Sequence, residues 1–124
     1  MSVVFDDFLQ SAENLLNNPD SKEIDFRNLI SRSYYALFHL SREIAETFPS
    51  LNNTNNYSSH EKIIAQFEQN PKTKKFAYLI NQRKLARCRA DYDIQEHVVR
   101  LEAARHFHAV KDLIKKLEQL KANP

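Results

Sequence analysis

The sequence of 124 residues contains no glycine, one cysteine and only four prolines. Glycine supplies the positive-φ positions that tight hairpins and many strand corners need. Its absence therefore argues against a turn-rich β fold and favours helices joined by loops rich in Asn, Ser and Pro. The single cysteine, Cys88, cannot form an intrachain disulfide, which fits a reducing compartment.

Features of export, of membrane insertion and of several cofactor classes are also missing. Residues 1–15 contain acids but no Lys or Arg, the reverse of a secretory signal, and the longest apolar stretch, around residues 34–40, is too short for a bilayer. We therefore expect a cytoplasmic protein without membrane contact. Without glycine there is no Gly-rich phosphate loop, and no Cys/His spacing resembles a zinc site, so we expect neither cofactor nor metal.

The apolar spacing predicts five helices in one domain spanning residues 1–124. The predicted helices cover residues 5–16, about 24–48, 58–69, about 74–90 and about 95–120. The second is apolar over much of its circumference, which is typical of a helix at the centre of a bundle. Short connections favour antiparallel neighbours. The predicted fold is therefore all-α, an antiparallel up-and-down four-helix bundle with a short accessory third helix.

Positive charge is concentrated in one segment, although the net charge of the chain is only +2. Residues 72–89 contain no acid and seven basic residues, namely Lys72, Lys74, Lys75, Arg83, Lys84, Arg87 and Arg89. Such a cluster binds phosphate backbones, because each neutralised phosphate releases counterions. A solvated helix face with acidic partners on neighbouring helices fits the same pattern.

A polar stripe runs along the second predicted helix. Arg32, Tyr35 and His39 recur at three- and four-residue spacing, so they share one face within about two turns. These side chains are candidates for holding a phosphate and a base. The alternative is that the stripe faces water or a second copy of the chain.

The end of the fourth predicted helix is the densest candidate site. Arg87 and Asp91 are four residues apart, so Asp91 can hold Arg87 in a pose that presents its planar fork to a phosphate. The alternative is an ordinary ion pair within the helix, which contributes only a few tenths of a kcal/mol at a surface.

Two segments resemble a known family. Residues 31–39, Ser-Arg-Ser-Tyr-Tyr-Ala-Leu-Phe-His, resemble the S-R-x-Y-Y-A-x-F signature of a branch of small bacterial and archaeal HEPN-like proteins. His60 then precedes an Ile/Phe-containing helix, and residues 87–93 resemble the R-x-x-A-D-Y-D segment of that branch, followed by a long final helix. The resemblance spans roughly residues 25–117.

The resemblance implies a four-helix bundle that often dimerises around a composite cleft. Many HEPN proteins are metal-independent endoribonucleases of toxin-antitoxin or antiphage systems, and many are paired with a nucleotidyltransferase antitoxin. In their usual motif an Arg binds the scissile phosphate and a His four to six residues later assists the attack of the 2′-hydroxyl. The expected partners are RNA or a nucleotide, a second copy of the chain and a nucleotidyltransferase.

We assign the candidate site residues on this basis. The catalytic candidates are Arg87, Asp91 and Tyr92. The candidates for binding nucleic acid or phosphate are Arg32, Tyr35, His39, Arg83, Lys84 and Arg89, and the accessory candidates are His60 and His97.

The sequence departs from the usual motif at one point, because the residue five after Arg87 is Tyr92 and not His. Tyrosine, with an ordinary pKa near about 10, is a poor general base at neutral pH. Arg100 and His106 have the motif spacing, but we expect them in mid-helix and about 120° apart, which makes the match accidental. Three functions therefore remain open: an RNA-cleaving toxin-like protein, a non-catalytic module that binds a nucleotide or a partner, and a plain dimerising domain.

Overall fold

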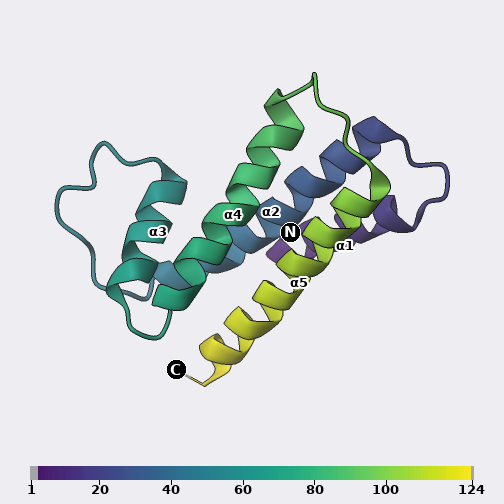
Figure 1. The fold of residues 1–124 in the computed structure, drawn as a ribbon. Helices are drawn as coiled ribbons and strands as arrows, with labels where there is room; N and C mark the ends of the chain where they lie inside the picture. The colour runs from purple at the N-terminus through teal and green to yellow at the C-terminus, as the bar shows by residue number, and fades with distance from the viewer. Residues whose placement is uncertain (1–2, 124) are drawn as a thin grey trace.

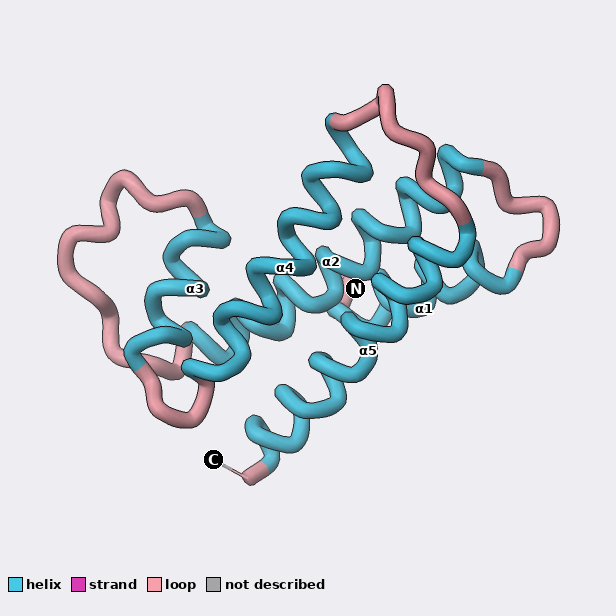
Figure 2. The backbone as a smooth tube through the Cα atoms, viewed as in Figure 1, coloured by secondary structure: helices cyan, strands magenta, loops and turns pink. Residues whose placement is uncertain are grey.

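The computed structural model describes residues 3–123, which contain five α-helices and no strand (Figures 1 and 2). The all-helical prediction is confirmed. None of the helices within residues 3–123 is long and apolar enough to cross a bilayer. The helices are α1 (Phe5–Asn17), α2 (Glu23–Ala45), α3 (Ser59–Gln69), α4 (Lys74–Tyr92) and α5 (Arg100–Ala122).

Helix α2 contacts each of the other four helices. Its inward positions are fully buried, with Leu29, Leu37 and Leu40 all 0% exposed, and Phe107 of α5 is 1% exposed. Helix α3 contacts α4 and α2, and Figure 1 shows it at the side of the molecule away from α1. Because α2 is apolar on several sides, it can carry side chains toward α1, α4 and α5 at once.

Local signals explain where two of the helices begin or end. The capping box predicted at the start of α3 is present, since the Ser58 hydroxyl accepts a hydrogen bond from the Glu61 amide and the Glu61 carboxylate accepts one from the Ser58 amide. Helix α1 ends at Asn17, two residues before Pro19, as the proline predicts.

Three helix boundaries differ from the predictions. Helix α2 ends at Ala45, so Phe48 lies in the following turn, where it still packs against the core. Helix α4 continues to Tyr92, and α5 begins at Arg100 rather than near residue 95. Residues 93–99 therefore form a connection between α4 and α5, and Val99 caps α5 instead of lying on it.

An ion pair on α2 between the buried Arg27 and the half-buried Glu23 holds this connection in place. The Arg27 guanidinium, whose residue is only 8% exposed, donates hydrogen bonds to the carbonyls of Ala90 and Asp93, at 2.9 and 3.0 Å, and to that of Glu96. Glu23 pairs with Arg27 at 3.0 Å and accepts a hydrogen bond from the amide of Val98. Since these backbone groups bind side chains of α2, the connection is ordered without being helical.

A buried histidine links α5 to α2 and α4. His106 is 3% exposed, its Nε2–H donates to the Ile30 carbonyl at 3.1 Å, and its Nδ1 accepts from Arg83 at 3.1 Å. Burial, followed by the charge of Arg83, lowers the pKa of His106 to about 3. The imidazole is therefore neutral in the folded protein at neutral pH.

We expect His106 to make the folded state lose stability as the pH falls. The unfolded chain takes up a proton below about pH 6.5, whereas the folded chain does so only near pH 3, so the stabilisation is complete above 6.5 and is lost between these values. The expected loss is roughly 1 kcal/mol per pH unit within that window. Urea unfolding at pH 7 and pH 5 should show a smaller pH effect in His106→Gln than in the wild type. His108→Gln, which changes an exposed histidine of the same helix, is the control, and an unchanged pH effect in His106→Gln contradicts the account.

Candidate functional site

Arg87 lies at the centre of a polar and aromatic cluster between α2 and α4. Its guanidinium carbon is 5.6, 5.7 and 5.9 Å from the ring centroids of Tyr34, Tyr35 and Tyr92, respectively. The Arg87 Nη1 atom pairs with Asp91 Oδ2 at 3.1 Å. The two candidates from the end of α4, Asp91 and Tyr92, are therefore both next to Arg87.

The guanidinium is partly open to solvent and stays charged. The Arg87 side chain is 16% exposed and that of Asp91 28%, while Tyr92 and Tyr35 are 74% and 38% exposed. Burial lowers the pKa of Arg87, but the hydrogen bond to Asp91 and the neighbouring Tyr35 raise it, and the net shift is upward. The Nε atom of Arg87 is buried and has no hydrogen-bond partner in the described part of the chain. A permanent cation thus lies between aromatic rings, and its ion pair within residues 3–123 is the one with Asp91.

Asp91 also connects α4 to α2. Its Oδ1 atom accepts a hydrogen bond from the hydroxyl of Ser31, while its other oxygen holds Arg87. The carboxylate therefore fixes the position of the guanidinium relative to α2, which is more than an ion pair within one helix can do.

His60 of α3 is the imidazole that joins the site through Tyr34. The Tyr34 hydroxyl lies 2.7 Å from His60 Nδ1, and Nε2 lies 3.1 Å from Asn81 Oδ1. Because the Asn81 oxygen can only accept, Nε2 carries the proton and Nδ1 accepts from Tyr34. Burial lowers the pKa of His60, and the positive charges of Lys84 and Arg87 lower it further. The hydrogen bond to Asn81 raises the pKa, but the net shift is downward, so the neutral form of the imidazole is favoured. We call this set the Arg87 cluster: Ser31, Tyr34, Tyr35, His60, Asn81, Arg87, Asp91 and Tyr92.

The polar stripe of α2 is divided between two neighbours. Arg32 donates a hydrogen bond to the Ser11 hydroxyl of α1 at 2.7 Å, and His39 stacks on Phe8 of α1 with a centroid distance of 5.1 Å. Tyr35 lies between them and contacts both Phe8, at 6.3 Å between centroids, and Arg87. Of these three candidates, the structure brings only Tyr35 to the Arg87 cluster.

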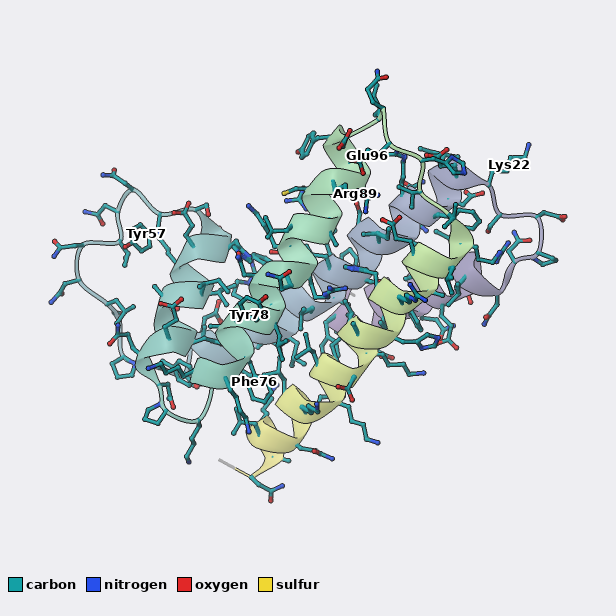
Figure 3. The ribbon with its side chains drawn as sticks, viewed as in Figure 1. Lys22, Tyr57, Phe76, Tyr78, Arg89 and Glu96 are labelled. Atoms are coloured by element: carbon teal, nitrogen blue, oxygen red, sulfur yellow. The ribbon has the colours of Figure 1, made fainter. Side chains whose placement is uncertain are left out.

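The basic residues of α4 also point in different directions. Arg83 binds the buried His106, and Arg89 pairs with Glu96 and Glu102, so both have internal partners (Figure 3 labels Arg89 and Glu96). Lys84 makes no ion pair with any residue between 3 and 123, and its charge helps to lower the pKa of His60. Lys84 is therefore the candidate cation that lies near the cluster and remains unpaired.

The remaining imidazole candidates lie outside the cluster. His97 is exposed in the α4–α5 connection and contacts Glu23 at 2.7 Å. Arg100 is the first residue of α5, not a mid-helix residue as expected, and its guanidinium donates to the carbonyls of Leu16 and Asn18. Because His106 is buried, it does not share a solvent-accessible space with Arg100. The motif spacing of these two residues therefore does not form a catalytic site.

Sequence reasoning did not single out Tyr34 or Asn81, although both position His60. In the sequence, Tyr34 stands out only as one of the two tyrosines of the segment that resembles the HEPN-like signature. Its burial, with 2% exposure, results from packing between helices. Burial raises the pKa of Tyr34, so its hydroxyl remains protonated and available as a donor. Asn81 precedes Lys84 by three residues, a spacing that indicates a shared face of α4 but no chemistry.

Comparison with known proteins gives no significant match to any family model, curated protein or solved structure. Among residues 3–123, no group of three or more His, Cys, Asp or Glu is arranged to hold a metal ion. The geometry of the Arg87 cluster is therefore the basis for assigning a function.

Proposed function

We propose that this chain is a HEPN-like protein that binds RNA at the Arg87 cluster and cleaves it. One observation carries the proposal. The guanidinium of Arg87 lies 5.6 Å from the ring centroid of Tyr34, whose hydroxyl is 2.7 Å from His60 Nδ1. A fixed cation and a neutral imidazole thus flank the same tyrosine. That pair is what RNA cleavage through the 2′-hydroxyl requires, and His60 takes the place of the histidine missing after Arg87.

The cleavage chemistry uses these two groups in different roles. Arg87 presents its remaining N–H groups to the non-bridging phosphate oxygens and neutralises the charge that develops there. When RNA displaces the Tyr34 hydroxyl, His60 Nδ1 accepts the proton of the 2′-hydroxyl. The 2′-oxygen then forms a bond to phosphorus, the bond from phosphorus to the 5′-oxygen breaks, and the leaving oxygen takes a proton from solvent. Tyr35 and Tyr92 offer exposed rings for base stacking.

The architecture is consistent with the same proposal. Packing of α1, α4 and α5 against α2 supports an antiparallel four-helix bundle with α3 as the accessory helix. A cytoplasmic homodimer, a toxin-antitoxin or antiphage role and a nucleotidyltransferase antitoxin complete the proposal, and the resemblance of residues 31–39 and 87–93 supports them.

The proposal is tested by incubating the protein with RNA in the presence of a metal chelator. The expected products end in a 2′,3′-cyclic phosphate and a 5′-hydroxyl, which mass spectrometry distinguishes from other ends. His60→Asn should cleave at least about 100-fold more slowly, the scale on which general acid–base catalysis contributes. His97→Asn, at an exposed histidine outside the cluster, should retain the wild-type rate. Equal rates for both variants remove His60 from the mechanism.

A second function is nucleotide binding without cleavage. It is favoured by the fact that His60 and Arg87 already have hydrogen-bond partners within the protein. Both ring nitrogens of His60 have partners, and Asp91 already occupies one arm of the Arg87 fork. If these contacts persist when a nucleotide binds, the cluster holds phosphate but lacks a free base. Calorimetric titration with nucleotides that detects binding, together with RNA that stays intact, identifies this case.

A further inference from the structure

A groove between α3 and α4 adjoins the Arg87 cluster at His60. Two hollows form this groove, one of about 250 Å³ and one of about 580 Å³. Ile64, Glu68 and Asn81 line both hollows, and His60 lines the smaller one. The larger volume falls within the range of about 300–1,000 Å³ that small-molecule sites occupy. The groove is therefore large enough for a base and shares His60 and Asn81 with the cluster.

Exposed tyrosine rings border both hollows. Tyr57, in the loop before α3, lines the smaller hollow and is 42% exposed, whereas Tyr78 of α4 lines the larger one and is 68% exposed. Figure 3 labels both side chains. Most of the Tyr78 surface and somewhat less than half of the Tyr57 surface are thus left uncovered by the fold. Aromatic rings beside a polar groove are the platforms on which proteins stack unpaired bases.

The polar groups of the larger hollow match one base better than the others. Glu68 and Lys74 both line it, and neither forms an ion pair or a side-chain hydrogen bond within residues 3–123. A carboxylate offers two acceptor oxygens, and guanine is the base that presents two adjacent donors, N1–H and N2–H, on its Watson–Crick edge. An ammonium group complements guanine O6 and N7. Adenine, cytosine and uracil each present only one donor group on that edge.

The groove leads along α4 toward Arg87. Asn81, Lys84 and Arg87 follow one another at three-residue spacing, so each lies about 60° around the helix from the one before it, with Lys84 between the other two. The six residues from Asn81 to Arg87 span about 9 Å along the helix axis, which is comparable to one nucleotide. A base in the groove therefore places its own phosphate near Lys84, which lies between the groove and Arg87.

We propose that the α3–α4 groove is a guanine subsite, in which Glu68 accepts from N1–H and N2–H and Tyr78 stacks on the base. The inference rests on the proposed RNA-binding function and adds a base preference to it. Glu68 lies at the surface, so replacing it leaves the fold unchanged. The subsite can thus be altered separately from the phosphate site.

The test is a calorimetric titration of the full chain with GMP and with AMP. We expect the wild type to bind GMP at least about tenfold more tightly than AMP, the usual scale of discrimination by a bidentate base contact. Glu68→Gln should lose this preference by weakening GMP binding and leaving AMP binding unchanged. Glu118→Gln, which makes the same charge change on α5 outside the groove, should keep the preference.

The outcomes separate this inference from the proposed function. Equal affinity for GMP and AMP, a preference that survives Glu68→Gln, or no binding of either nucleotide overturns the guanine subsite. If RNA is neither bound nor cleaved while GMP binding still depends on Glu68, the subsite stands and the RNA-cleaving function is rejected. If RNA is cleaved in an Arg87-dependent manner without any base preference, the RNA-cleaving function stands and the guanine subsite is rejected.

Discussion

Replacing Arg87 with Ala is expected to lower the rate of RNA cleavage by at least about 100-fold. Removing a single fixed hydrogen-bond donor to a developing oxyanion typically costs a factor of about 10²–10³ in catalytic rate. Arg87 is the partly exposed guanidinium that three tyrosine rings and Asp91 hold in one position, so its loss removes both the charge and the orientation. Single-turnover cleavage of a labelled RNA measures the effect on the chemical step.

Two further variants distinguish this role from loss of positive charge. Arg87→Lys keeps the charge but not the planar fork or the stacking, and we expect it to recover only a small part of the activity. Arg89→Ala makes the same change two residues later, at a side chain whose partners are Glu96 and Glu102, and should retain activity. Equal loss in Arg87→Ala and Arg89→Ala contradicts a specific role for Arg87 and indicates a general effect of charge.

Arg27→Ala is expected to lower the free energy of unfolding by at least about 2 kcal/mol, because a hydrogen bond to a charged group contributes about 1.5–3 kcal/mol and the buried Arg27 makes several. The substitution removes the guanidinium that pairs with Glu23 and that donates to the carbonyls of Ala90, Asp93 and Glu96. Because the total stability of a domain is about 5–15 kcal/mol, the effect is large. Urea unfolding followed by circular dichroism measures it.

Arg42→Ala is the matched control for that experiment. Arg42 lies on the same helix and pairs with Glu46 at 3.9 Å, with the two side chains 50% and 71% exposed. Exposed pairs of this kind contribute about 0–1 kcal/mol. A similar loss of stability in both variants would show that the carbonyl contacts of Arg27 do not hold the α4–α5 connection.

The stability of this connection bears on the site, because it follows directly after Asp91 and Tyr92. Arg27 binds the carbonyls on both sides of these two residues, those of Ala90 and Asp93. The end of α4 is thereby fixed against α2, and the Arg87–Asp91 pair with it. The same contacts explain why α4 extends two residues further than its apolar pattern predicts.

Periodicity and capping residues predicted the existence of all five helices. The predicted boundaries between α4 and α5 were wrong because they depend on distant partners. Residues 93–99 are held by Arg27 and Glu23, about 70 positions earlier in the chain. No local pattern in residues 93–99 reveals such a contact. Apolar spacing was therefore sufficient for the elements but not for the connection between α4 and α5.

The candidate site was predicted in part for the same physical reason. The four-residue spacing of Arg87 and Asp91 is a property of one helix, and their ion pair is present. The pairing of His60 with Tyr34 and with Asn81 joins three helices, so it depends on how the helices pack. Likewise, spacing placed Arg32, Tyr35 and His39 on one face, but the position of α1 decides that Arg32 and His39 contact α1 while Tyr35 reaches Arg87.

The central claim is that Arg87 contacts an RNA phosphate, and equilibrium binding of an RNA that cannot be cleaved tests it most directly. A 2′-O-methyl oligonucleotide with a fluorescent label allows anisotropy titrations at several salt concentrations. We predict that Arg87→Ala weakens binding by about tenfold and reduces the slope of log affinity against log salt by about 0.7, the value for one phosphate contact on a single strand. An affinity and a salt slope identical to those of the wild type contradict the account.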